Sequence, residues 1–107
     1  MNPDIESLIQ QLTLEEKIRL LAGADNWQTH AVERLGIPSL KMSDGPNGAR
    51  GAWGSLAAFS ACTPVGTALA ATWNPALVEQ VGALLGDETR VKGADVLLAP
   101  TVNLHRT

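Results

Sequence analysis

Residues 95–100 (D-V-L-L-A-P) form an apolar run without alternation between polar and apolar positions. A strand with one solvent-facing side alternates, whereas a strand of a parallel sheet that is covered on both faces is apolar throughout. The run therefore predicts a buried strand, which needs partners along its edges and cover on both faces. These demands limit the folds open to a chain of 107 residues.

The strongest helix signal lies directly before this run. Asn74 suits an N-cap, Pro75 suits the first helical position, and Trp73 can pack on Val78 as a hydrophobic staple. Residues 92–93 (K-G) supply a cation in the last turn and then a stop. The stripe between these ends keeps helical spacing and consists of Leu77, Val81, Leu84 and Leu85.

Two further helices are expected near the amino terminus. Asn2 followed by Pro3 has the pattern of an N-cap and a first helical residue, and apolar residues then recur at helical spacing. Residues 13–16 (T-L-E-E) fit a capping box, in which the threonine hydroxyl and the last glutamate each accept a backbone N–H. Gly23 is expected to end this second helix.

A first strand is expected at residues 39–43, and residues 44–72 then carry many glycines and prolines with little periodicity. A loop of this length inside a compact domain is usually functional. Strand, loop, helix and strand form one βαβ unit with parallel strands and a right-handed crossover. Because a complete barrel takes about 250 residues, the predicted fold class is α/β, the first units of a (β/α)8 barrel in a partial, helix-rich form.

The composition excludes several classes of protein. Eight Lys plus Arg against eleven Asp plus Glu give a net charge of −3 and no basic face, so nucleic acid is not an expected partner. No stretch approaches the roughly 20 apolar residues that cross a membrane, and the pattern of a secretory signal is missing, so a cytoplasmic location is expected. The single cysteine, Cys62, cannot pair within the chain and is interpreted as a small apolar filler, with a reactive thiol as the alternative.

Asp44 follows the first predicted strand, and functional sites of α/β barrels lie at the carboxyl ends of the strands. An ionised carboxylate can accept hydrogen bonds from adjacent sugar hydroxyls. The alternative, which the local pattern alone favours, is that residues 44–48 (D-G-P-N-G) only form turns. Arg50 either orients Asp44 through an ion pair or is an exposed loop charge with little energetic effect, and local pattern again favours the second.

Aromatic and histidine residues give weaker signals. Trp53, in the glycine-rich loop, either stacks on a sugar ring or anchors the loop, whereas Trp27 and Trp73 are assigned to packing. Neither His30 nor His105 has other ligand residues at metal-binding spacing, so no metal site is expected. The glycine pattern does not match a dinucleotide or phosphate-binding fingerprint, so no cofactor is expected either.

Five segments occur in order along nearly the whole chain: residues 12–18 (LTLEEKI), 35–38 (LGIP), 43–51 (SDGPNGARG), 66–74 (GTALAATWN) and 99–106 (APTVNLHR). Together they resemble glycoside hydrolase family 3, of the β-glucosidase type. The resemblance implies a (β/α)8 barrel followed by an α/β sandwich domain. It also implies a β-glucoside or an oligosaccharide as the substrate.

The resemblance assigns roles to individual residues. It implies that Asp44 binds hydroxyls of the non-reducing glucose, that Arg50 lines or braces this site, and that Asn103 and Arg106 are structural. The two catalytic carboxylates of a retaining family member, together with its Lys-His pair and G-G-R-N block, do not occur in this sequence, so no catalytic residue is assigned here. Residues 61–65 (A-C-T-P-V) depart from the family pattern F-P-C-G-T, which puts the packing of the first loop in doubt.

Two hypotheses follow from this resemblance. The leading one is the amino-terminal portion of a retaining, exo-acting β-glucosidase that hydrolyses terminal β-linked glucose, with the remainder of the parent enzyme as its partner. The alternative is a truncated, non-catalytic carbohydrate-binding protein. Under either hypothesis the chain alone is expected to be inactive.

Overall fold

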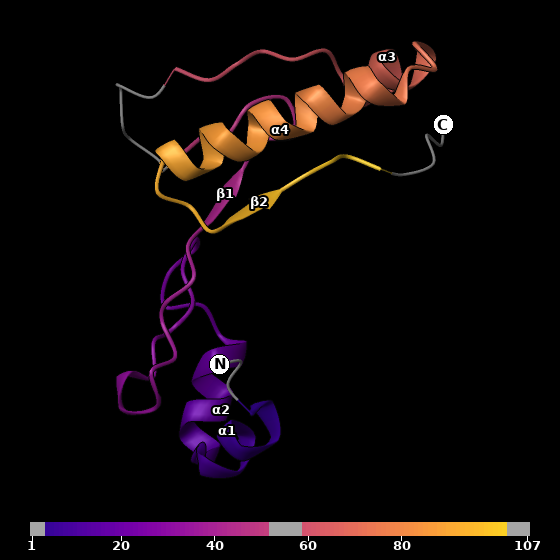
Figure 1. The fold of residues 1–107 in the computed structure, drawn as a ribbon. Helices are drawn as coiled ribbons and strands as arrows, with labels where there is room; N and C mark the ends of the chain where they lie inside the picture. The colour runs from indigo at the N-terminus through magenta and orange to yellow at the C-terminus, as the bar shows by residue number, and fades with distance from the viewer. Residues whose placement is uncertain (1–3, 52–58, 103–107) are drawn as a thin grey trace, which may run out of the picture. The chain divides into compact units, whose positions relative to one another are not determined.

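The computed structural model describes residues 4–51 and 59–102, whose fold is drawn in Figure 1. The chain divides into two compact units, Met1–Lys41 and Met42–Thr107. The regular elements described in the first unit are short helices, and the second unit contains a pair of strands and the longest helix.

The first helix, α1 (Ile5–Gln11), begins later than its sequence signal implies. The cap predicted at Asn2 is wrong, because Asp4 is the N-cap residue and its carbonyl oxygen accepts the Leu8 N–H at 3.0 Å. This bond is the first of the helix and sets its start. Asn2 and Pro3 themselves lie outside the described residues.

The second helix, α2 (Leu14–Leu21), begins at the predicted capping box. Thr13 Oγ1 accepts the Glu16 N–H at 3.2 Å, and Glu16 Oε2 accepts the Thr13 N–H at 2.8 Å. Gly23 does not end the helix as predicted, because the backbone is already extended directly after Leu21. The glycine instead allows a close approach, since an added Cβ would lie 2.4 Å from the Asp25 carbonyl oxygen.

Arg34 ties the 3₁₀ helix Glu33–Leu35 to both preceding helices. Its Nε donates to Glu16 Oε1 at 2.7 Å, and its Nη2 donates to Glu16 Oε2 and, at 2.9 Å, to the Gln11 carbonyl oxygen. Bidentate arginine–carboxylate pairs fix geometry as well as adding energy. Glu16 therefore both caps α2 and anchors Arg34.

The second unit contains the parallel strands β1 (Met42–Asp44) and β2 (Val96–Leu98), which confirms the predicted direction of pairing. Both strands are shorter than predicted. Leu40 belongs to the first unit instead, where it exchanges hydrogen bonds with Thr29 at 3.0 and 2.8 Å. The first strand therefore starts only at Met42 and runs up to Asp44.

The long helix, α4 (Pro75–Val91), confirms the prediction for this segment. Asn74 Oδ1 accepts the Leu77 N–H at 3.1 Å, and Pro75 occupies the first turn. Gly93 has a φ of 66°, in the left-handed region that suits a glycine stop.

The segment before α4 differs from the prediction in two ways. A short helix, α3 (Gly66–Ala71), lies within the stretch predicted to be loop, because its alanines and leucine favour helix despite the surrounding glycines and prolines. Trp73 was assigned to packing and to a staple on Val78, and both predictions are wrong. It is 92% exposed and has a φ of 51°, in the left-handed turn between the two helices.

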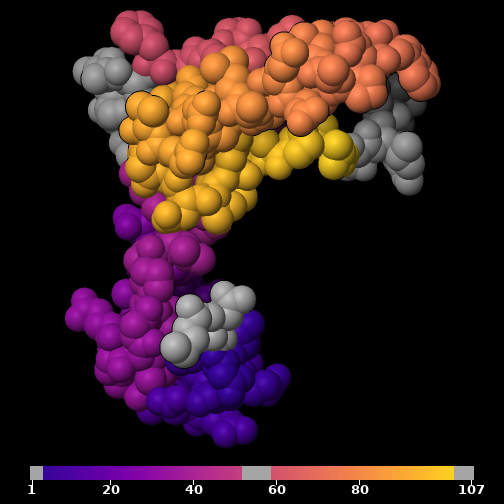
Figure 2. All heavy atoms as spheres, in the orientation of Figure 1, coloured from indigo at the N-terminus to yellow at the C-terminus, as the bar shows by residue number. Residues whose placement is uncertain are grey.

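The core of the second unit is small, and the buried residues other than glycine in its described part are Ser43, Ala49, Leu85, Thr89 and Ala94. Val96 and Leu98 of β2 are 39% and 49% exposed, and atoms of α4 and β2 lie at the surface in Figure 2. The prediction that the second strand is buried on both faces is therefore wrong for this chain. Two short strands and one long helix do not supply enough cover.

Replacing Glu16 with Gln should loosen α2 near neutral pH and have no effect in strong acid. The hydrogen bond from Arg34, followed by that from the Thr13 N–H, lowers the pKa of Glu16 from 4.5 to about 2. The ionised carboxylate therefore stabilises the fold above about pH 4.5, and this contribution is lost as the pH falls toward about 2. Hydrogen-exchange protection of the α2 amides in wild type and Glu16→Gln across this pH range measures the effect.

Glu15→Gln is the matched control, because Glu15 forms only an exposed ion pair with Arg19 at 2.9 Å. Pairs of this kind contribute little, so the control should change protection only slightly at any pH. A wild-type advantage over Glu16→Gln that persists undiminished at about pH 2 would contradict the assigned role.

Candidate functional site

Asp44 is the last residue of β1 and lies opposite Leu98, at the carboxyl ends of both strands. Its side chain is 38% exposed, so groups outside the chain can reach the carboxylate. Ligands of parallel α/β folds bind at this end of the strands. The sequence placed Asp44 just after the strand, and the structure makes it the terminal strand residue.

Arg50 folds back onto Asp44 through its backbone and its side chain. Its N–H donates to the Asp44 carbonyl oxygen at 2.8 Å, and its Nη1 lies 3.0 Å from Asp44 Oδ2. The ion pair considered in the sequence analysis therefore forms, although the Arg50 side chain is 56% exposed, as the alternative expected. An exposed pair of this kind adds little stability, so its main effect is to orient the carboxylate.

Two glycines make this return of the chain possible. Gly45 and Gly48 have φ values of 134° and 157°, and the Gly48 N–H donates to the Gly45 carbonyl oxygen at 3.2 Å. A Cβ on Gly45 would lie only 1.9 Å from the Gly48 carbonyl oxygen. The turn interpretation of residues 44–48 is thus correct for the backbone, and the turn is what brings Arg50 back to Asp44.

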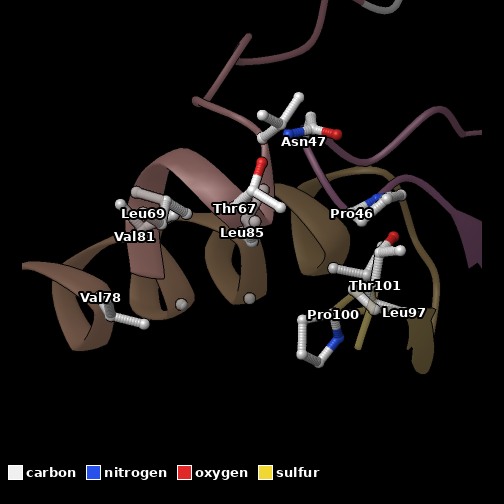
Figure 3. Close-up of a pocket in the computed structure, with 15 residues that line it drawn as sticks. Pro46, Asn47, Thr67, Leu69, Val78, Val81, Leu85, Leu97, Pro100 and Thr101 are labelled. Carbon is white, nitrogen blue, oxygen red and sulfur yellow. The ribbon is translucent and has the colours of Figure 1, made fainter. Parts of the chain in front are cut away.

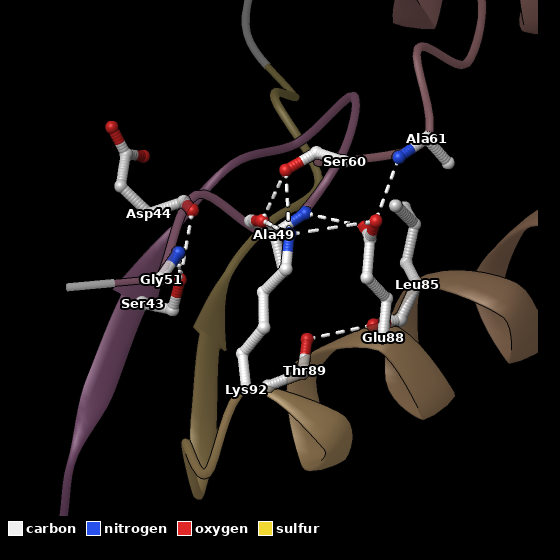
Figure 4. Close-up of polar contacts among 10 residues, drawn as sticks. All are labelled: Ser43, Asp44, Ala49, Gly51, Ser60, Ala61, Leu85, Glu88, Thr89 and Lys92. Carbon is white, nitrogen blue, oxygen red and sulfur yellow. Dashed lines mark hydrogen bonds and ion pairs between the residues drawn. The ribbon is translucent and has the colours of Figure 1, made fainter. Parts of the chain in front are cut away.

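Ser43 is fully buried and holds both ends of this turn (Figure 4). Its Oγ accepts the Gly51 N–H at 3.1 Å and donates to the Asp44 carbonyl oxygen at 3.0 Å. A hydroxyl can donate and accept at once, which a buried alanine or valine could not do. The sequence analysis assigned no separate role to Ser43.

A hollow of about 360 Å³ lies beside Asp44 and Arg50, and its lining includes Ser60, Ala61 and Cys62. This volume is at the low end of small-molecule pockets, which span roughly 300–1,000 Å³. Cys62 is exposed, so its interpretation as a small apolar filler was wrong. The chain has no helix or strand at this point and lies outside the small core.

A larger hollow of about 710 Å³ lies among α3, α4 and the residues that follow β2 (Figure 3). Sugar sites need several polar groups that converge on hydroxyls. Here Asn47 Nδ2 is engaged with the carbonyl oxygens of Thr63 and Pro64 at 3.1 and 3.0 Å. Most of the lining is aliphatic and includes Leu69, Val78, Val81, Leu85 and Leu97, so this hollow has the character of uncovered core.

Glu88 and Lys92 of α4 hold the loop that follows Asp44 (Figure 4). Glu88 accepts the N–H groups of Ala49 and Ala61 at 2.7 and 2.6 Å, and Lys92 donates to the Ala49 carbonyl oxygen and to Ser60 Oγ. Burial raises the pKa of the Glu88 carboxyl, but the two N–H donors and Lys92 lower it by more, so the pKa lies below its ordinary value. The carboxylate is therefore ionised at neutral pH.

The sequence analysis missed Glu88 and treated Lys92 only as a cation at the helix end. The available signal was a pair of opposite charges four residues apart on one helix. The same pattern is common on solvated helix faces, so it does not identify a buried pair.

Several predicted residues have no described position. Trp53, Asn103, His105 and Arg106 lie outside the described residues, and their roles stay predictions. Trp27 is partly buried, in line with its assignment to packing. Across residues 4–51 and 59–102, no three His, Cys, Asp or Glu side chains cluster to hold a metal ion, and no helix is long and apolar enough to cross a membrane.

Comparison with known proteins gives consistent matches. Residues 3–107 match the model of the glycosyl hydrolase family 3 N terminal domain. The chain is 56% identical to a β-glucosidase of Rhizobium radiobacter over 105 residues, and 53% identical to a probable β-glucosidase I of Aspergillus fumigatus over 104 residues. These alignments cover 96% and 97% of the chain but only 13% and 12% of those relatives.

Solved structures of β-glucosidases are also similar to this chain. A β-glucosidase from Kluyveromyces marxianus in complex with glucose has a TM-score of 0.88 and 46% identity over 94% of this chain and 12% of its own. β-Glucosidase 3B from Thermotoga neapolitana, also in complex with glucose, has a TM-score of 0.80 and 36% identity over 95% of this chain and 17% of its own.

Replacing Gly45 with Ala should disrupt the turn that returns Arg50 to Asp44. The new Cβ would overlap the Gly48 carbonyl oxygen, 1.9 Å away, in a backbone region that disfavours side chains. In the complete parent enzyme, we expect a loss of at least about 2 kcal/mol in the free energy of unfolding, measured by urea denaturation.

Gly93→Ala is the matched control, because Gly93 also has a positive φ, of 66°, but its added Cβ meets nothing within 4 Å. It should lose only the backbone preference of about 1 kcal/mol. Equal losses for the two variants would show that the turn accommodates a side chain without disruption.

Proposed function

Since this chain belongs to glycosyl hydrolase family 3, we propose that it forms the amino-terminal part of the (β/α)8 barrel of a β-glucosidase. In this proposal Asp44 binds hydroxyl groups of the terminal glucose that the enzyme releases, and Arg50 braces Asp44. The later barrel units and a following sandwich domain belong to the remainder of the parent enzyme. The substrate is a β-glucoside or an oligosaccharide with a terminal β-linked glucose.

The exposed carboxylate of Asp44 at the strand ends is the observation that carries this proposal. A carboxylate offers about four lone-pair sites, and Arg50 Nη1 donates to Oδ2 at 3.0 Å. Acceptor capacity therefore remains for sugar hydroxyls. The structures of similar β-glucosidases that contain glucose support this choice of ligand.

The chemistry is proposed to lie outside this chain. A retaining glycosidase needs two carboxyl groups on either side of the scissile bond, one as nucleophile and one as acid and base. Glu88, which is brought close to the same loop, is not suited to either role, because its oxygens accept two backbone N–H groups and lie beside Lys92. We therefore assign binding, and not catalysis, to the described residues.

Replacing Asp44 with Ala in the parent enzyme should lower kcat/KM by about 100-fold or more. Each hydrogen bond between a charged group and a neutral partner contributes roughly 1.5–3 kcal/mol, and Asp44 is proposed to make two of them to the sugar. Such bonds tighten as the reaction proceeds, so transition-state binding suffers most. Steady-state kinetics with an aryl β-glucoside measure the loss.

Asp87→Ala is the control, because Asp87 is an exposed carboxylate that pairs with Arg90 at 2.7 Å on the surface of α4. It should retain kcat/KM within about twofold. Nearly normal kcat/KM in the Asp44→Ala enzyme would rule out the role proposed for Asp44.

The 107-residue chain alone should show no glycosidase activity and no cooperative unfolding transition. Its core is small, and both strands of its two-stranded sheet have an unpaired edge among the described residues. Differential scanning calorimetry and an aryl β-glucoside assay of the purified chain test this. A cooperative transition together with turnover would overturn the proposal that the chemistry lies elsewhere.

The coding sequence beyond residue 107 separates the proposed enzyme from the alternative of a truncated, non-catalytic carbohydrate-binding protein. Continuation into G-G-R-N, Lys-His and S-D-W-like segments is the expected result. A stop codon directly after Thr107 would favour the alternative.

A further inference from the structure

We infer that Glu88 and Lys92 are positioning residues for the sugar-binding carboxylate, because they fix the backbone from which Arg50 reaches Asp44. The inference rests on the proposed function of Asp44. It adds to the binding machinery two residues of α4 that act through the loop backbone.

Ala49, the residue before Arg50, is held by side chains of α4. Ala49 is fully buried, and both of its backbone polar groups are engaged by α4. Glu88 Oε2 accepts its N–H at 2.7 Å, and Lys92 Nζ donates to its carbonyl oxygen. The two peptide groups that flank the Ala49 Cα are each held by a charged group and have little freedom to rotate, so the direction in which Arg50 leaves the turn is set by α4.

The other arm of the loop, residues 59–64, is held by the same two side chains. Glu88 Oε1 accepts the Ala61 N–H at 2.6 Å, and Lys92 donates to Ser60 Oγ at 2.6 Å. Ser60 Oγ in turn donates to the Ala49 carbonyl oxygen at 2.5 Å. One carboxylate and one ammonium group therefore hold both arms of the loop to the same helix.

A backbone contact reinforces this arrangement. Gly48 lies so close to the second arm that an added Cβ would be 2.0 Å from the Ala61 carbonyl oxygen. The Asn47 side chain and backbone also bond to Thr63, at 3.1 and 2.9 Å. The two arms thus form one structure, and a shift of either arm on α4 moves the other.

The Asp44–Arg50 ion pair itself is weak. Arg50 is more than half exposed, at 56%, and an ion pair of this kind contributes little to holding its own geometry. The Glu88 and Lys92 side chains are only 14% and 10% exposed, so their bonds are better protected from water. The more buried Glu88–Lys92 pair of α4 therefore determines the position of the exposed Asp44–Arg50 pair.

The test uses the complete parent enzyme and a double-mutant cycle. Glu88→Gln keeps the shape of the side chain but replaces one acceptor oxygen with an NH₂ donor, which then faces a backbone N–H. We expect kcat/KM for an activated aryl β-glucoside to fall about 10- to 100-fold, since small displacements of binding groups have effects of this size. Glu79→Gln is the matched control on an exposed face of α4 and should change kcat/KM by less than about twofold.

The readout that distinguishes positioning from simple destabilisation is non-additivity. Once Asp44 has been replaced by Ala, its position no longer matters, so Glu88→Gln should lower kcat/KM further by less than about threefold. A loss of the same factor in both backgrounds would overturn the inference, as would a loss no larger than that of Glu79→Gln. Near-normal activity of Asp44→Ala alone would instead refute the proposed function.

Ser60→Ala provides a second test of the inference if Glu88→Gln yields no soluble enzyme. It removes only the hydroxyl that links Lys92 to the Ala49 carbonyl oxygen. We expect a several-fold loss of kcat/KM that disappears in the Asp44→Ala background. No loss, or an equal loss in both backgrounds, would overturn the inference.

Discussion

The carboxylate of Glu88 is the group on which the arrangement of the second unit depends. The loop arms that it joins bring few large apolar side chains, and among the described residues Ser43 is the largest side chain that is fully buried. Hydrogen bonds to an ionised group, each of roughly 1.5–3 kcal/mol, take the place of hydrophobic packing. The adjacent Lys92 offsets the buried charge, which would be strongly destabilising without a partner. Local rigidity is thus reached with a very small core.

The apolar surfaces of the same unit, in contrast, are poorly covered. Leu84 of α4 and Leu98 of β2 are about half exposed, at 50% and 49%, and the aliphatic hollow of about 710 Å³ lies between these elements. Contiguous apolar surface of this kind normally contacts further protein. The curated relatives are about eight times as long as the aligned segment, which makes up 12–13% of their length. The proposed barrel would cover these surfaces with its later units.

Features that depend on neighbouring residues could be predicted from the sequence. The capping box at Thr13 and the N-cap at Asn74 need only residues within one turn, and both form. Features that depend on distant residues could not be predicted. Glu88 meets the Ala49 N–H across 39 positions, and nothing in a helix stripe indicates where such a carboxylate points. The exposure of Trp73 was missed for the same reason, because its burial depends on which other residues surround it.

Because the Asp44–Arg50 ion pair is exposed and therefore weak, a short turn of the backbone is needed to bring the two residues together. In water, two charges about 4 Å apart interact by roughly 1 kcal/mol, and by roughly 4 kcal/mol where the effective dielectric constant is about 20. A sugar and the remaining parts of a barrel would displace water from this site and so strengthen the pair. The turn through Gly45 and Gly48 therefore keeps Arg50 beside the Asp44 carboxylate, where the pair can gain strength in the assembled site.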